Sequence, residues 1–134
     1  MPNDCVFCRI VAGQVPSWKV HEDDSTYAFL DIAPFSEFHT LVVTKHHFES
    51  VFDLPAEEMA SLALGLKAVV DLLARKIGLS DVQILNSSGA AAQQDVFHVH
   101  FHVVPRANGD GQDVRRTAHP EWSSRFDDLI SRLA

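Results

Sequence analysis

Residues 98–104 read HVHFHVV, a run in which histidine alternates with an apolar residue. This alternation is typical of a β-strand, and it predicts a strand over residues 97–104 with one polar and one apolar face. The imidazoles of His98, His100 and His102 would share a face at intervals of about 6.6 Å, so the row would span about 13 Å. One small ligand does not easily contact all three, so the row predicts at least two separate tasks.

Two other interpretations of the row stay open. A half-exposed strand could carry histidine simply as a polar residue, although three repeats by chance are improbable. A catalytic metal centre would need all three rings within about 2.1 Å of one ion, which the length of the row makes awkward. Upstream, His39 precedes and His47 follows the β-branched run TLVVT at residues 40–44. If that run pairs with the histidine strand, His39 would approach one end of the row and His47 would approach His98.

The rest of the chain predicts an α+β fold. Residues 55–77 carry apolar side chains at steps of three and four, and Pro55 and Gly78 suit the two ends of a helix. Short runs of aromatic and branched residues predict strands, and strands with few helices between them favour an antiparallel sheet. The expected elements are a short helical turn before Gly13, strands at residues 18–22, 26–32, 40–44, 82–85 and 97–104, and helices at residues 55–77 and 121–133.

The composition fits one compact domain. The chain has 134 residues, of which 46% are hydrophobic and 22% charged, and its formal net charge is −7. A negative surface repels phosphate polymers, so a general nucleic-acid binder is not expected. The sequence has no run of about 20 apolar residues and no signal-peptide pattern at its start, which predicts a cytoplasmic protein with no membrane partner.

Cys5 and Cys8 form a CxxC pair. A thioredoxin-like redox pair would follow a strand, but only four residues precede Cys5. A disulfide between such near neighbours is rare in the cytosol. Two thiolates at this spacing supply half of a tetrahedral zinc site, and histidines suit the other half. Zinc is therefore the favoured interpretation, with two further ligands to be identified.

Together these motifs resemble the histidine triad (HIT) superfamily, and most closely its Hint branch of nucleoside phosphoramidases. The resemblance runs from about residue 5 to residue 106, through HVHFHVVPR, HTLVVTKHH, AFLDIAP around Asp31 and the loop before the triad. It implies a single HIT domain over residues 1–134, with a core at about 5–106 and a C-terminal helical tail at about 107–134. It also implies a five-stranded antiparallel sheet with one long and one or two short helices, and a homodimer with a continuous ten-stranded sheet.

The resemblance implies a role for each matched residue. His100 would attack the α-phosphorus of a purine nucleotide or nucleotidyl conjugate, and water would release a nucleoside monophosphate from the covalent nucleotidyl-histidine. His102, His39 and Gln94 would assist at the phosphate. Residues matching the family's ribose carboxylate, base wall and phosphate loop would bind the nucleotide, namely Asp31, Phe7, Ile10, Phe29, Ile32, Ser87 and Asp95.

Bacterial relatives with an N-terminal cysteine pair hold a structural zinc, and the resemblance carries this site over as well. The matching ligands are Cys5, Cys8, His47 and His98. Four protein ligands leave no open position, so this metal would stabilise the fold and take no part in the reaction.

Four positions depart from the family's usual pattern. Thr44 stands where proline is usual, Ser87 stands for asparagine, Gln93 for glycine and Asp95 for serine or threonine. An ionised Asp95 only accepts hydrogen bonds, so the leaving group would be protonated more slowly or from elsewhere. Two alternative functions therefore stay open, a dinucleoside polyphosphate hydrolase and a zinc-stabilised nucleotide-binding module with little turnover.

Overall fold

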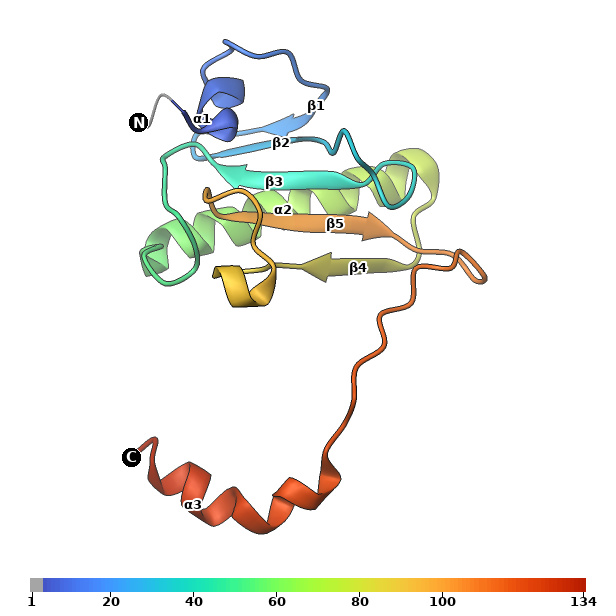
Figure 1. The fold of residues 1–134 in the computed structure, drawn as a ribbon. Helices are drawn as coiled ribbons and strands as arrows, with labels where there is room; N and C mark the ends of the chain where they lie inside the picture. The colour runs from blue at the N-terminus through green and yellow to red at the C-terminus, as the bar shows by residue number, and fades with distance from the viewer. Residues whose placement is uncertain (1–3) are drawn as a thin grey trace.

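A five-stranded antiparallel sheet in the order β1-β2-β3-β5-β4 forms the centre of the protein (Figure 1). The computed structural model describes residues 4–134. The strands are β1 (Lys19–Glu22), β2 (Thr26–Leu30), β3 (Thr40–Thr44), β4 (Val82–Leu85) and β5 (His100–Pro105). The α-helices are α1 (Val6–Val11), α2 (Ala56–Ile77) and α3 (Phe126–Ser131), and 3-10 helices span Ala90–Ala92 and Pro120–Arg125. The predicted α+β class is confirmed.

Helix α2 covers one face of the sheet (Figure 1). It ends, as predicted, at Gly78, whose φ of 70° is left-handed and favours glycine. Gly65 lets the helix approach β2 closely, because a Cβ there would lie 2.5 Å from Cγ2 of Thr26. Met59 and Ile77, near the two ends of α2, follow the predicted apolar spacing but are 38% and 42% exposed. The core between helix and sheet contains Ala28, Val42, Leu62, Val69, Leu73 and Val103.

The opposite face of the sheet carries α1 and a second core. Side chains alternate along a strand, so β2 and β3 each contribute to both cores. Ala28 and Val42 face α2, whereas Phe29 and Val43 face the other way. The second core consists of Phe7, Ile10, Tyr27, Phe29, Leu41 and Val43.

The strands predicted at residues 18–22 and 26–32 are both present and form a hairpin, but the second strand is shorter than predicted. β1 pairs with β2 in antiparallel fashion, but β2 ends at Leu30 and not at residue 32. The backbone N–H of Asp31 instead donates to His39 O at 2.9 Å, which closes the loop between β2 and β3. This closure places Asp31 beside His39.

Strand β5 also begins later than predicted, at His100, so His98 precedes the strand. The last residue pair of the β3–β5 ladder is Val43 with His100. Beyond it β3 offers no partner, and the N–H of Val99 donates instead to Phe48 O at 2.7 Å. The three triad histidines therefore do not form one regular strand face, and His98 is set by loop contacts.

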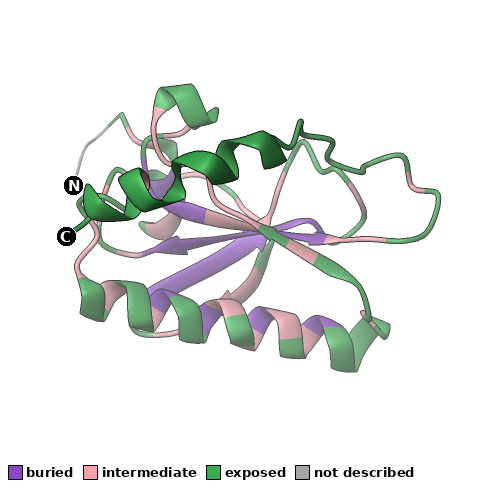
Figure 2. Ribbon diagram, turned by 90° about the horizontal axis from the view of Figure 1, so that it is seen from below, coloured by how far each residue is buried: buried purple, intermediate pink, exposed green. Residues whose placement is uncertain are grey.

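The chain leaves the sheet after β5 as a tail that carries α3 away from it (Figure 1). The helix predicted at residues 121–133 is instead the 3-10 helix Pro120–Arg125 followed by α3. Bonds from residue i+3 to residue i, such as Trp122 N–H to His119 O at 3.1 Å, tighten its first part. The tail is exposed along almost its whole length (Figure 2), including Trp122, Phe126, Ile130 and Leu133.

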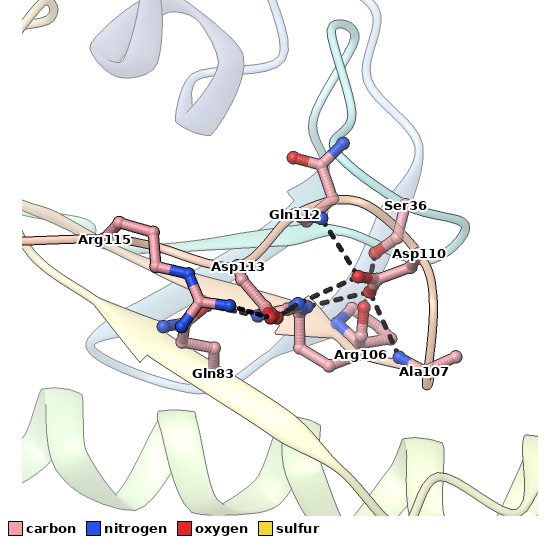
Figure 3. Close-up of polar contacts among 9 residues, drawn as sticks. Ser36, Gln83, Arg106, Ala107, Asp110, Gln112, Asp113 and Arg115 are labelled. Atoms are coloured by element: carbon pink, nitrogen blue, oxygen red, sulfur yellow. Dashed lines mark hydrogen bonds and ion pairs between the residues drawn. The ribbon is translucent and has the colours of Figure 1, made fainter.

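Arg106 fixes the start of this tail (Figure 3). Its Nε and Nη2 donate to the two carboxylate oxygens of Asp110 at 2.8 Å, and Nη2 also donates to Asp113 at 2.7 Å. The Arg106 hydrogen bonds hold the pKa of Asp110 well below its usual range. Nη1 donates to the Gln83 side chain on β4 at 3.0 Å, so the turn is tied to the edge of the sheet.

Candidate functional site

The antiparallel pairing of β3 with β5 creates two histidine clusters, one beyond each end of β3. His39 precedes β3, and its Nε2 lies 2.9 Å from Nδ1 of His102. His47 follows β3, and its Nδ1 lies 3.2 Å from Nδ1 of His98. The triad histidines are thus divided in space, with His98 in one cluster and His102 in the other, and the three triad rings do not converge on one point.

Hydrogen bonds determine which nitrogen carries the proton in the first cluster. The backbone N–H of Phe35 donates to His39 Nδ1 at 3.0 Å, so the His39 proton is assigned to Nε2. His39 Nε2–H then donates to His102 Nδ1. The His102 proton is consequently on Nε2, which makes this ring a donor for an anionic ligand.

His100 carries its proton on the other ring nitrogen, Nδ1. Its Nδ1 lies 2.7 Å from the carbonyl oxygen of His98, which can only accept, so Nδ1 carries the proton and Nε2 keeps a lone pair. The Phe7 ring packs against the imidazole in a T-shaped arrangement, with centroids 5.1 Å apart. The Asn86 side chain donates to the His100 carbonyl oxygen at 2.9 Å. Ring and backbone of His100 are therefore both held in place.

A cavity of about 330 Å³ opens beside His100 and His102. Its wall is mainly apolar, and its volume lies in the range of small-molecule sites. Phe7, Ile10 and Phe29 form a buried part of the wall, whereas Ile32 is 85% exposed. The predicted nucleotide-binding residues that line the cavity are Phe7, Ile10, Phe29, Asp31, Ile32 and Asp95.

Asp31 connects the cavity to the first histidine cluster. Its Oδ1 accepts the Ala33 backbone N–H at 2.8 Å, and its Oδ2 lies 3.6 Å from His39 Nε2. A carboxylate has about four lone-pair sites, so Asp31 retains acceptor capacity for hydroxyl groups of a ligand.

Gln94 holds the loop before β5. Its side-chain oxygen accepts the Gly89 N–H at 2.8 Å, and its amide nitrogen donates to Glu49 O at 2.6 Å and Val96 O at 3.0 Å. Both ends of the carboxamide are thus used within the loop, and a contact of Gln94 with phosphate stays a prediction. Gln93 beside it has φ of 73°, a left-handed conformation that favours glycine.

Burial keeps the first cluster uncharged. It lowers the pKa of His39 and lowers that of His102 to about 4, with the neighbouring His100 as a further cause for His102. Both rings are therefore neutral near pH 7, and they offer hydrogen bonds without a positive charge.

We expect acidification from pH 6.5 to pH 4 to destabilise the protein. His39 and His102 titrate near pH 6.5 when unfolded but at lower pH in the fold, so the unfolded state binds more protons in this window. The melting temperature should fall by several degrees across the window in scanning calorimetry. His102→Gln should flatten this dependence, since the amide does not titrate. An identical pH profile in the variant would contradict the assignment.

Cys5, Cys8, His47 and His98 form the second cluster, with ligand atoms that all lie within 4.8 Å of one another. The Cys8 sulfur is 3.3 Å from His47 Nδ1 and 3.5 Å from His98 Nδ1, and the Cys5 sulfur is 3.4 Å from His98 Nδ1. A tetrahedral zinc ion with usual bond lengths requires about 3.3 Å between two nitrogens and about 3.6 Å between nitrogen and sulfur. The cluster has these dimensions.

The protonation of this cluster also suits a metal. His98 Nε2 lies 2.7 Å from the Thr44 carbonyl oxygen, so its proton is there and Nδ1 has a lone pair that faces His47 Nδ1. Burial lowers the pKa of His98 to about 4, and burial with the adjacent Cys5 thiol raises the pKa of Cys8 to about 11. A cation would stabilise the converging lone pairs, and it would stabilise the Cys8 thiolate that burial otherwise disfavours.

Three residues that position the site were not assigned a role from the sequence, namely Phe35, Asn86 and Thr44. Phe35 and Thr44 act through backbone groups, which leave no signal in residue type. Asn86 stands one position before Ser87, which does not line the cavity. The asparagine side chain itself was the signal that could have identified this position.

Residues 12–109 match the family model of the HIT domain. The chain belongs to the HIT family. A HIT-like protein of Methanocaldococcus jannaschii is 43% identical over 111 residues, which cover 83% of this chain and 85% of the relative. An adenosine 5'-monophosphoramidase of Saccharomyces cerevisiae is 36% identical over 125 residues, 93% and 75% of the two chains. An adenylylsulfatase of Arabidopsis thaliana is 34% identical over 110 residues, 82% and 56%.

Solved structures of HIT proteins have the same fold. A Streptococcus mutans protein superposes with a TM-score of 0.93 at 35% identity, covering 99% of this chain and 85% of that one. A zinc-bound histidine triad family protein from Mycobacterium smegmatis has a TM-score of 0.77 at 37% identity, with 96% and 97% covered. No helix within residues 4–134 of this HIT protein is long and apolar enough to cross a membrane.

Proposed function

We propose that this HIT protein hydrolyses nucleoside phosphoramidates or related nucleotidyl conjugates at the α-phosphate. The observation that carries the proposal is the state of His100, whose Nδ1 is bound to His98 O at 2.7 Å while Nε2 presents a lone pair beside the cavity. A neutral, oriented imidazole is an effective nucleophile near pH 7. Relatives named as an adenosine 5'-monophosphoramidase and an adenylylsulfatase support nucleotide hydrolysis.

The reaction takes two displacements at phosphorus. In the first, the His100 Nε2 lone pair forms the N–P bond, and the electron pair of the breaking bond goes to the leaving nitrogen, which takes a proton from solvent water. In the second, a water oxygen attacks phosphorus and releases a proton to solvent, while the electron pair of the N–P bond returns to Nε2. The products are the free amine and a nucleoside monophosphate.

His102 is the proposed donor to the phosphoryl oxygens. Its Nε2–H is set by the bond from His39, and burial keeps both rings neutral. A donor that is already oriented requires no rearrangement as charge develops in the transition state. Gln94 would support this chemistry through the loop that it orders, together with the loop's backbone amides.

The nucleoside is proposed to occupy the apolar cavity. Asp31 would accept hydrogen bonds from the ribose hydroxyls, and Phe7, Ile10, Phe29 and Ile32 would pack against a base. Such a wall provides burial and stacking but few directional bonds, so a purine is favoured by its larger surface. A role for Ser87 in the phosphate loop stays part of the proposal.

The second cluster is proposed to be a structural zinc site. Zn²⁺ would be held by Cys5, Cys8, His47 and His98, and it would stabilise the fold by joining α1 to the loops that flank β3 and β5.

This HIT protein is further proposed to be a homodimer with a ten-stranded sheet. β4 is an edge strand on which Val82 and Ile84 are 36% and 44% exposed, which supports pairing of two such edges.

The proposal is tested by incubating the protein with adenosine 5'-phosphoramidate and, in parallel, with diadenosine tetraphosphate. We expect release of adenosine monophosphate, with a larger kcat/KM for the phosphoramidate, because its leaving group adds no negative charge to an acidic site. Faster cleavage of diadenosine tetraphosphate would instead identify a polyphosphate hydrolase. Tight binding of adenosine monophosphate without turnover of either compound would identify a binding module.

A further inference from the structure

Asp95 lies where the catalytic cavity meets a second groove. Its Oδ1 is 3.8 Å from His100 Nε2. The residue lines both the 330 Å³ cavity and a neighbouring groove of about 410 Å³, and the two spaces also share Val6 and Val96. A ligand that extends from one space into the other therefore passes the Asp95 carboxylate.

The neighbouring groove is acidic. Asp4 and Glu49 line it together with Asp95, and its other lining residues are Cys5, Val6, His47, Val96 and Phe97. Among these described residues there is no lysine or arginine to neutralise the carboxylates. A positively charged group in the groove gains Coulomb energy, whereas a phosphate or sulfate is repelled.

The direction of the proposed reaction places the leaving group near this groove. The nucleoside occupies the apolar cavity and the phosphorus lies at His100, so the part beyond the phosphorus needs space outside the cavity. The groove past Asp95 adjoins the cavity there, since Val6, Asp95 and Val96 line both spaces. Asp95 Oδ1 accepts the Val96 backbone N–H at 2.8 Å, which holds the carboxylate at the junction.

We propose that Asp95 is a specificity-determining residue that selects amine leaving groups bearing a positive charge over leaving groups bearing a negative charge. The inference rests on the proposed function. The Asp95 side chain is 81% exposed, so its carboxylate is accessible to a leaving group in the groove. We consider a charged group of the leaving amine about 4 Å from the Asp95 carboxylate in a water-like dielectric. Attraction of a cationic group and repulsion of an anionic group together change the ratio of kcat/KM for the two substrates by about tenfold or more.

The test uses three adenosine phosphoramidates with the same P–N bond and chain length, made from 1,3-diaminopropane, propylamine and β-alanine. While bonded to phosphorus, the three amine parts carry a positive charge, no charge and a negative charge at pH 7, because only their distal groups differ. The ratio of kcat/KM for the cationic to the anionic compound is measured in the wild type and in Asp95→Asn, which can still accept the Val96 N–H. Asp71→Asn removes one charge from exposed α2, on the other face of the sheet, and serves as the matched control.

We expect Asp95→Asn to lower this ratio about tenfold, Asp71→Asn to leave it within about twofold, and added salt to weaken the wild-type preference. Intrinsic differences among the three amines cancel when wild type and variant are compared. An equal ratio in wild type and Asp95→Asn, with adenosine monophosphate released from all three, overturns the inference about Asp95 and leaves the proposed function standing. No release from any of the three overturns both.

Discussion

Replacing His100 with alanine should reduce the release of nucleoside monophosphate by about four orders of magnitude or more, because no other described group near the cavity combines a fixed lone pair with access to phosphorus. Among the ring nitrogens of His39, His100 and His102 in the described chain, only His100 Nε2 has an assigned lone pair that accepts no hydrogen bond from another group of the protein. Single-turnover and steady-state assays with adenosine 5'-phosphoramidate measure the loss.

The fold should survive this substitution. The His100 side chain bonds to a backbone carbonyl and contributes no metal ligand, so zinc content and the circular dichroism spectrum should match the wild type. His21→Ala is the matched control, since His21 bonds to Asp23 in the β1–β2 hairpin. Full activity of His100→Ala would end the proposed mechanism, and loss of zinc from it would show that the two clusters are not separable.

Changing Cys5 and Cys8 together to serine should remove zinc and lower the melting temperature by about 10 °C or more. Hydroxyl groups are poor zinc ligands, and α1 would lose its tie to His47 and His98. Structural zinc binds small domains with a free energy on the order of 10 kcal/mol. The free energy of unfolding of a single domain is about 5–15 kcal/mol, so losing even part of the zinc contribution should lower the melting temperature strongly. Elemental analysis, calorimetry and hydrogen exchange over residues 5–12 measure the effect.

A chelator provides the matched control for the cysteine variant. It should destabilise the wild type by a similar amount and leave the double variant unchanged, because the variant has no zinc to lose. One zinc per chain is expected in wild-type protein purified under reducing conditions. Absence of zinc from such protein, or retention of zinc by the double variant, would contradict the assignment of the second cluster.

From the sequence, the presence of each helix and strand was predicted more accurately than the residues at which it begins and ends. The run TLVVT matched β3 at both bounds, because a β-branched run too short for a helix is typical of a buried strand. The histidine alternation predicted β5 but placed its start too early, because periodicity does not reveal where a partner strand ends. The apolar spacing near Trp122 and Phe126 predicted one helix, but the structure has a 3-10 helix followed by α3, and both side chains are exposed. The spacing of apolar residues identifies those that share one face of a helix, but it does not show which other part of the protein packs against that face.

The candidate site was predictable in its residue types and less so in its connections. CxxC indicated half of a metal site from coordination chemistry alone, but His47 and His98 join it only through the β3–β5 pairing and the loops beyond it. The protonation of His39 and His100 depends on a backbone N–H of Phe35 and a backbone carbonyl of His98. Backbone groups are common to all residues, so no reading of side-chain types could have found them.

His98 has three separate polar contacts. Its Nδ1 lies 3.4 Å from the Cys5 sulfur, its Nε2 donates to Thr44 O, and its backbone carbonyl accepts from His100 Nδ1. In a relative without the metal, the Nε2 bond to the carbonyl oxygen at position 44 would still require a side-chain donor, whereas any residue supplies the backbone carbonyl. Histidine at this position should therefore persist in lineages that have lost both cysteines and the histidine equivalent to His47. In a survey of genomes, the residues at the positions of Cys5, Cys8 and His47 should therefore distinguish metal-binding from metal-free relatives. The triad motif should be present in both groups.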